Sequence, residues 1–368
     1  MLLDVLRSSV FWELCIAGLI GFGGLWAWLL GVGRYTRRRA LREQIAALGQ
    51  VSTDSALAAL TGMRRNIGDA LLGLLGSSAR PTSRSQLYRT PWILFVGDEA
   101  ADVPGLLAAA HHTTAQPAPP ARESMSDAFW RWWLLGPLVA IETHADAVCE
   151  SSAVRERSLW LQALLELTVR RERLPLNGIV VCVSATTLWD DAAGIETTGR
   201  HLKRLVDETT QLLHLQLPVY LVVNGLEKLR GQQAVCGALA PDVLKQALGH
   251  RFAFNELDDS SGARFDTAFA AFMDRLHALR LALALNQASA AHHLAVHQFV
   301  DDVDALGPGL RLLVEQLFNH TDTAEPPASR WRGFYFTCAA EGGAPGAFVS
   351  DLFQQLLPDD QALARAST

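Results

Sequence analysis

The sequence predicts an α/β domain with a parallel sheet, preceded by one membrane-spanning helix. Four short runs rich in valine, isoleucine and leucine suit strands that are buried on both faces of such a sheet. Segments with helical apolar spacing alternate with these runs, which implies right-handed crossovers between parallel strands. An uncharged apolar run near the N-terminus is about long enough to cross a bilayer.

Composition favours a folded protein that does not bind nucleic acid. The chain has 368 residues, of which 49% are hydrophobic, and a net charge of −6. Nucleic-acid binding requires a concentrated basic surface that neutralises phosphates, and the only basic cluster lies near the N-terminus. Nucleic acid is therefore not an expected partner.

Cysteines and histidines give no sign of a metal site. The five cysteines are far apart, and no two have the C-x-x-C spacing of zinc ligands. His111 and His112 are adjacent, and His293 and His297 would share a helix face, but neither group has a suitably placed third ligand. We expect buried thiols in a reducing compartment, no metal and no cofactor.

Residues 14–33 form the predicted membrane span. Trp26 and Trp28 lie toward its C-terminal end, where indole rings favour the interface. Arginines follow directly, at Arg34, Arg37, Arg38, Arg39 and Arg42. They predict a cytoplasmic C-terminal side, whereas a signal peptide would carry its positive charge before the apolar run. Residues 1–33 are interpreted as a tail and a single-pass helix.

Residues 34–87 are predicted to be a juxtamembrane helical region and a linker. Leu41, Ile45 and Leu48 recur at helical spacing, and the pattern extends to about Leu75. The stretch SSARPTSRS at 77–85 is rich in residues that favour loops. A folded domain is expected to begin at residue 88.

The α/β domain is predicted over residues 88–231. Its strands are expected at 92–97, 138–142, 178–184 and 218–224. Helices are expected at 158–171, before the third strand, and at 200–215, before the fourth. In such a sheet the ligand site lies at the carboxyl ends of the strands.

The loop after the first predicted strand occupies the place of a phosphate-binding G-x-x-x-x-G-K-[ST] loop. It reads Gly97, Asp98, Glu99, Ala100, Ala101, Asp102, Val103, Pro104. Only the first glycine of the motif is present. Asp102 replaces the second glycine, Val103 the lysine and Pro104 the hydroxyl residue, and the three carboxylates would repel a triphosphate. The loop is predicted to be a degenerate phosphate loop that does not support hydrolysis.

Two further motifs of a nucleotide site, for metal binding and for base recognition, are altered. Glu142 and Thr143 end the second predicted strand, where an active relative would carry an aspartate for Mg²⁺ followed by a glycine. Asn224, Gly225 and Glu227 stand where a guanine-reading [NT]-K-x-D signature would lie, with the lysine and the aspartate both replaced. Metal binding and base recognition are therefore expected to be lost together.

Short segments in a fixed order resemble the IcmF/TssM family, the inner-membrane component of type VI secretion systems and of their Dot/Icm-like relatives. The most specific are LPLNGIVV at 174–181 and PVYLVV at 218–223. Trp132 and Trp133, with RGFYFT at 332–337, are similar to further family landmarks. The resemblance extends from about Tyr88 to Phe353.

The resemblance implies a GTPase-like sheet interrupted by a helical insertion. The insertion is expected at 232–329, where 265–286 has helical apolar spacing. Residues 330–339 would return as a final strand, and 330–368 would end in a helix. Members usually begin with two membrane helices and carry a third with a large periplasmic region. The sequence has apolar length for one helix, which would fit a short paralogue, a split gene product or a truncated form.

The resemblance implies a non-catalytic scaffold or adaptor of a type VI secretion membrane complex, in the bacterial inner membrane with its soluble domain in the cytoplasm. Implied partners are a DotU/TssL-type inner-membrane protein, baseplate components, the membrane and further copies of the chain. One alternative is a membrane-tethered NTPase that uses Glu142 as metal ligand and Lys228 in place of the loop lysine. Another is a regulatory decoy that competes with a full-length relative.

Trp130, Trp132 and Trp133 are candidate partner contacts, because tryptophans often anchor interfaces. The competing interpretation is that they cover the sheet from a neighbouring loop. The sequence favours this second interpretation.

Overall fold

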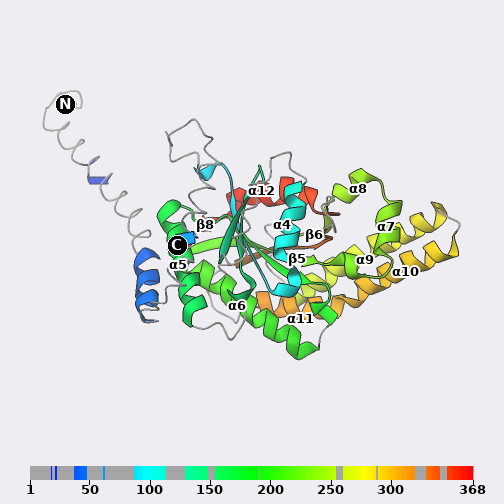
Figure 1. Cartoon of the computed structure of the whole chain (residues 1–368), viewed down its shortest axis with the longest axis horizontal. Coiled ribbons are helices and arrows are strands. Elements are labelled where there is room, and N and C mark those ends of the chain that lie inside the picture. Colours follow the sequence, from blue (N-terminus) through cyan, green and yellow to red (C-terminus); the bar gives the residue numbers. More distant parts are fainter. Residues whose placement is uncertain are drawn as a thin grey trace, which may run out of the picture.

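The computed structural model describes the α/β domain and part of the N-terminal region (Figure 1). The described residues are 18, 21–22, 37–47, 61–62, 87–112, 129–147, 154–189, 191–253, 260–286, 289–319, 329–339 and 346–367. Except for three residues, the predicted membrane span at 14–33 lies outside them, as does the predicted linker at 77–85. Among the helices of the described part, none has the length and apolar character needed to cross a bilayer.

A mixed eight-stranded sheet forms the centre of the domain. Its strands are β1 (Trp92–Gly97), β2 (Trp130–Leu134), β3 (Val139–Thr143), β4 (Gly178–Ser184), β5 (Leu215–Asn224), β6 (Leu248–Arg251), β7 (Ser329–Thr337) and β8 (Arg365–Ala366). The order is β2-β3-β1-β4-β5-β7-β6, and β8 pairs separately with β5. The central strands β3, β1, β4, β5 and β7 are parallel, whereas β2, β6 and β8 pair antiparallel. The predicted parallel core is confirmed.

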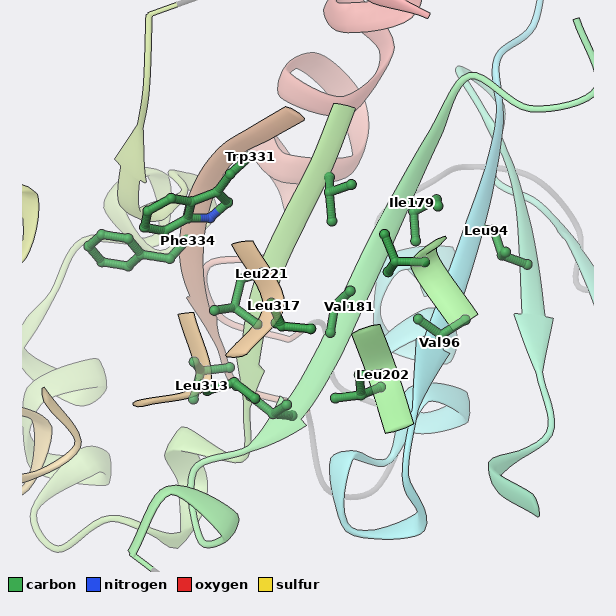
Figure 2. Packing of buried hydrophobic residues seen from close by; sticks show 14 of the residues in the cluster. Leu94, Val96, Ile179, Val181, Leu202, Leu221, Leu313, Leu317, Trp331 and Phe334 are labelled. Atoms are coloured by element: carbon green, nitrogen blue, oxygen red, sulfur yellow. The ribbon is translucent and has the colours of Figure 1, made fainter. Parts of the chain in front are cut away.

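One face of the sheet is covered mainly by long helices. These are α5 (Val154–Arg170), α6 (Ala192–Leu213) and α11 (Gly307–Phe318). Figure 2 shows Leu202 of α6 and Leu313 of α11 packed over the sheet side chains Val181 and Leu221. All four are at most 1% exposed. Burying one such side chain contributes about 1.5–3 kcal/mol, so this layer is a main source of stability.

The opposite face is covered by α4 (Val103–His112) and by a helical segment at 352–363. The segment combines a π-helical turn (Leu352–Leu356), the short α12 (Leu357–Asp359) and a 3₁₀ turn (Asp360–Leu363). Phe95 of β1 stacks on Phe353 with ring centroids 5.5 Å apart. Both sheet faces are therefore buried, which explains why the central strands are apolar at successive positions.

The region expected to be a helical insertion contains α7 (Gln232–Ala238), α8 (Pro241–Lys245), α9 (Ser261–Asn286), α10 (Ala290–Ala305) and α11. Helices α9 and α10 lie side by side and extend from the sheet at the right of Figure 1. The region is not wholly helical, because it also contributes the edge strand β6. Strand β7 returns beside β5, as predicted for 330–339.

Helix α6 begins earlier than predicted. The expectation was a start at residue 200, but the helix starts at Ala192, because the Asp191 side chain accepts a hydrogen bond from the Gly194 amide. At its other end His214 adopts a left-handed conformation, with φ of 46°. That residue ends the helix, so Leu215 belongs to β5.

A buried ionic cluster ties the C-terminal segment to three strands. The Asp360 carboxylate accepts two hydrogen bonds from Arg332 of β7, each 3.0 Å long, and one of 2.5 Å from Arg251 of β6. The Tyr220 hydroxyl of β5 donates a further one at 2.7 Å. Because Asp360 is 5% exposed and Arg332 is 6% exposed, these partners replace solvent for both charges.

Residues 37–47 form a helix docked on the domain, in blue in Figure 1. Arg37 donates hydrogen bonds to the carbonyls of Arg173 and His214, and Arg38 donates to the carbonyl of Thr168. Leu41 is fully buried. Two of the arginines that the sequence assigns to the flank of a membrane helix therefore also bind the ends of α5 and α6.

Candidate functional site

The candidate site lies at the carboxyl ends of β1, β3 and β5, where an α/β sheet of this kind would bind a ligand. The segment from Gly97 leads through a 3₁₀ turn (Glu99–Ala101) into α4. A β-carbon at Gly97 would lie 2.8 Å from the Cys182 carbonyl oxygen and 2.9 Å from Val103 Cγ2. The glycine that survives from the motif is thus required by close packing.

The carboxylates of the loop bind the amides of the same loop. Asp98 Oδ1 accepts a hydrogen bond of 2.9 Å from the Ala101 amide, and Asp102 Oδ1 accepts one of 3.0 Å from the Gly105 amide. Asp102 adopts a left-handed conformation with φ of 45°, which aspartate tolerates better than most residues. A phosphate loop offers such amides to an anion. Here the protein's own side chains occupy two of them.

Val103 and Pro104 are the first two residues of α4. Val103 is 2% exposed, and the Pro104 ring needs no hydrogen-bond donor in the first turn of a helix. Glu99, at the start of the 3₁₀ turn, is exposed. Val103 occupies the position at which a phosphate-binding motif would carry its lysine.

Glu142 ends β3 as a buried carboxyl group held by neighbours on β2. Its Oε2 accepts a hydrogen bond of 2.6 Å from Trp133 Nε1 and lies 3.5 Å from Arg131 Nη1. Burial raises the pKa of Glu142 above 4.5, against the opposing influence of Arg131 and Trp133, and the charge of Asp102 acts in the same direction as burial. Thr143 is also buried. Its hydroxyl has no hydrogen-bond partner within the described chain.

The Asn224 side chain is hydrogen-bonded to the loop after β1. Its Nδ2 donates a hydrogen bond of 3.0 Å to the Ala101 carbonyl, and its Oδ1 accepts one of 3.2 Å from the Thr337 hydroxyl. The side chain is 2% exposed. The predicted base-reading position is therefore in direct contact with the loop after β1. The side-chain amide of Asn224 links this loop to β5 and β7.

Gly225 and Glu227 shape the turn after β5. Gly225 has φ of 96°, a conformation that favours glycine over lysine. Glu227 is half-buried beside Cys338, and Lys228 is exposed. The carboxylate that replaces the aspartate of the signature thus faces a thiol.

The three tryptophans lie on strand β2, which the sequence did not predict. Trp130 is fully buried against Trp160, with ring centroids 5.9 Å apart, and Trp132 is 8% exposed against Trp92, at 4.9 Å. Trp133 is partly exposed and binds Glu142. The rings of Trp130 and Trp132 are part of the hydrophobic core, which leaves little of either ring for a partner contact. They lie on a strand of the sheet and not on a neighbouring loop.

The structure also brings together two cysteines that no sequence signal connects. Gln232 Nε2 lies 3.2 Å from Cys236 Sγ and 3.3 Å from Cys338 Sγ. Burial raises the pKa of Cys236, and it raises that of Cys338 to about 12. Both thiols therefore stay protonated and unreactive at neutral pH. No cluster of metal-ligating side chains occurs in the described part of the chain.

Comparison with known proteins decides the family. A model described as the IcmF-related N-terminal domain matches residues 153–368, more than half of the chain. The chain belongs to the IcmF-related family. The landmarks at 174–181, 218–223 and 332–337 all lie within the matched residues, in or beside strands β4, β5 and β7.

A curated relative is the type VI secretion system component TssM1 of Pseudomonas aeruginosa. It is 23% identical to this IcmF-related chain over 337 residues, which cover 87% of the chain and 30% of the relative. The chain thus spans about 30% of the length of that relative. The chain is therefore related to a type VI secretion system component over most of its own length.

Proposed function

We propose that this chain is a non-catalytic, membrane-anchored scaffold or adaptor of a type VI secretion membrane complex, with a GTPase-like domain that binds partner proteins. The observation that carries the proposal is the occupation of the loop amides by Asp98 and Asp102. A domain that bound nucleotide there would have to break both contacts and bring a triphosphate next to these two carboxylates.

The arrangement of the sheet supports a phosphate-loop ancestry. A central parallel strand, β1, runs into a short loop and then directly into helix α4, the order of parts found in phosphate-loop proteins. The loop has kept this path while Val103 and Pro104 have replaced the residues that would hold phosphate and metal. The fold then serves as an interaction surface.

The rival interpretation, a membrane-tethered NTPase, receives less support. Its metal ligand would be Glu142, whose raised pKa and hydrogen bond from Trp133 make it a weaker ligand than a free carboxylate. Its cationic group would be Lys228, which is exposed after β5. Phosphoryl transfer depends on positioned cations that stabilise the transition state.

The first test is catalytic. The chain is incubated with Mg²⁺ and GTP or ATP, and phosphate release and thermal unfolding are measured. We expect no turnover and no stabilisation, although a nucleotide at 100 times its Kd would add about 2.7 kcal/mol. Turnover that disappears in Gly97→Asp would refute the proposal, since that variant blocks the loop.

The second test concerns partners. The tagged chain is recovered from detergent-solubilised membranes of its host, with and without added Mg²⁺ and GTP. We expect a small DotU/TssL-type inner-membrane protein to co-purify in equal amounts under both conditions. Recovery that depends on nucleotide would contradict a scaffold without nucleotide chemistry, and recovery of no membrane protein would contradict the membrane-complex assignment.

A further inference from the structure

One end of the domain carries exposed arginines from separate parts of the sequence. They are Arg39 and Arg42 on the docked helix, Arg89 before β1, Arg170 at the end of α5, Arg173 just after it, and Arg365 on β8. Arg171, between two of them, adds a fully buried guanidinium that lies over the rings of Tyr88 and Trp92.

Strand direction and hydrogen bonds place all of these groups at the amino ends of the parallel strands. Arg89 lies three residues before β1, and Arg365 pairs with Gln216 at the start of β5. Arg37 joins the docked helix to the same end through the carbonyls of Arg173 and His214. Figure 1 shows the blue helix, α5 and β8 together on the left. We call this surface the amino-end face.

The amino-end face has few neutralising carboxylates. Glu43 pairs with Arg39, and Glu172 pairs with Arg38. No ion pair holds Arg42, Arg89, Arg170 or Arg173 within the described residues. The positive charge of these four arginines is therefore available to an external anion.

The opposite end of the strands is acidic. It carries Asp98, Glu99, Asp102, Asp146, Asp191 and Glu227 in the loops after β1, β3, β4 and β5. The domain is thus polarised along its strands although the whole chain has a net charge of −6. A polarised protein is oriented by a charged surface, because only its basic end is attracted to an anionic one.

We propose that the amino-end face lies on the membrane and binds anionic lipid headgroups. The proposal rests on the membrane anchoring proposed above, because Arg37, the first described residue of the docked helix, comes four residues after the end of the expected membrane span. The helix holds the amino-end face within reach of the bilayer. Each arginine near an anionic leaflet strengthens the contact about fivefold, within a Debye length of about 8–10 Å. The acidic loops then face the cytoplasm.

The test uses the full chain in lipid nanodiscs of phosphatidylcholine alone or with phosphatidylglycerol. Hydrogen exchange is measured at the amides of 168–174, on the amino-end face, and at 225–231, at the opposite end. We expect phosphatidylglycerol to slow exchange at 168–174 by about fivefold or more and to leave 225–231 unchanged. High salt should remove the difference.

A matched pair of variants tests the arginines. In one, Arg42, Arg89, Arg170 and Arg173 become glutamine; in the other, Arg200, Lys228, Lys245 and Arg275 become glutamine. Both lose the same charge, but only the first loses it from the amino-end face. We expect the first to lose the lipid effect and the second to keep it. Exchange at 178–184, in β4, where neither variant is changed, shows whether each variant is folded.

Three outcomes would overturn the proposal. Equal exchange at 168–174 in both lipids would show that the anchored domain does not touch headgroups. An equal lipid effect in both variants would exclude the named arginines. Duplex DNA that slows exchange on neutral nanodiscs as strongly as phosphatidylglycerol would indicate a nucleic-acid surface instead. Failure of anchoring is distinguishable, because the chain would then separate from nanodiscs of both compositions.

Discussion

The Arg37 guanidinium donates a hydrogen bond of 3.4 Å from Nη2 to the main-chain carbonyl of His214, 177 residues away. The same carbonyl accepts a hydrogen bond of 2.9 Å from the Ser367 amide. His214 ends α6, where carbonyl groups lack partners within the helix. One helix terminus therefore holds both the docked helix and the last strand of the described chain.

The docked helix should loosen when Arg37 is removed. Arg37→Ala deletes two hydrogen bonds to carbonyls from a side chain that is 6% exposed, at an expected cost of about 1–3 kcal/mol. Amide hydrogen exchange over residues 38–47 should accelerate. Arg39→Ala is the control, because Arg39 is exposed and forms an ion pair with Glu43 on the docked helix itself. Equal acceleration in both variants would contradict the docking role.

The ionic cluster at Asp360 should be a large contributor to stability. Asp360→Asn leaves Arg332 and Arg251 without their buried counter-charge, at an expected cost of about 3–5 kcal/mol in urea denaturation. Asp359→Asn, at the exposed neighbouring position, is the control and should cost little.

The same carboxyl predicts a response to acid. Burial of Asp360 opposes ionisation, but the hydrogen bonds from Arg332, Tyr220 and Arg251 outweigh it, so its pKa lies below 3.8. The contribution of the Asp360 carboxylate to the free energy of unfolding is therefore complete above pH 3.8. It is lost as the pH falls through the lower pKa of the folded state. The stability gap between wild type and Asp360→Asn should shrink in strong acid. A constant gap would exclude a charge-based role.

Glu142 should show the opposite dependence on pH. Burial raises the pKa of Glu142 above 4.5 in the folded protein. The contribution of its protonated form to stability is therefore complete below pH 4.5 and is lost as the pH rises through the pKa of the folded state. Glu142→Gln keeps an oxygen that can accept from Trp133 but removes the titration. The melting temperature of the variant should fall less than that of wild type between pH 4.5 and 7.5. A steeper fall in the variant would show that Glu142 is stabilised as a carboxylate.

The packing of helix α11 against the loop after β4 should require the glycine at position 309. A β-carbon at Gly309 would lie 2.1 Å from the Leu188 carbonyl oxygen, so Gly309→Ala must displace backbone and should cost several kcal/mol. Gly237→Ala on α7 is the control, because its β-carbon would meet nothing within 4 Å. That change should be neutral or stabilising by up to about 1 kcal/mol. Thermal unfolding of the two variants tests the contrast.

The parallel core could be predicted because its strands carry continuous apolar runs, as at 178–184. Strand β2 escaped prediction, since WRWWL has no clean alternation and its arginine and tryptophans suggest a loop as readily. Strand β6 is four residues with a glycine, and only its pairing with β7 makes it a strand. Strand β8 is two residues long and depends on a partner far away in sequence.

The loop of the candidate site could be located from the sequence, but its internal contacts could not. The position of Gly97 after the first strand located the loop, and the residue types in it led to the prediction that it does not support hydrolysis. That Asp102 would bind the Gly105 amide depends on a left-handed turn, and that Asn224 would hold the Ala101 carbonyl depends on strand order. Likewise, Arg37 and Arg38 suggest only a membrane flank until α5 and α6 place carbonyls within their reach.

The junction at His214 also has a mechanical consequence. A pull applied between the docked helix and β8 would load a few hydrogen bonds at one edge of the domain, while the pairing among β1, β4 and β5 would carry almost no tension. The hydrogen bonds between β8 and residues Leu215 and Gln216 would break first, one after another. Under such a pull the domain would yield at these attachment points while its sheet stayed intact.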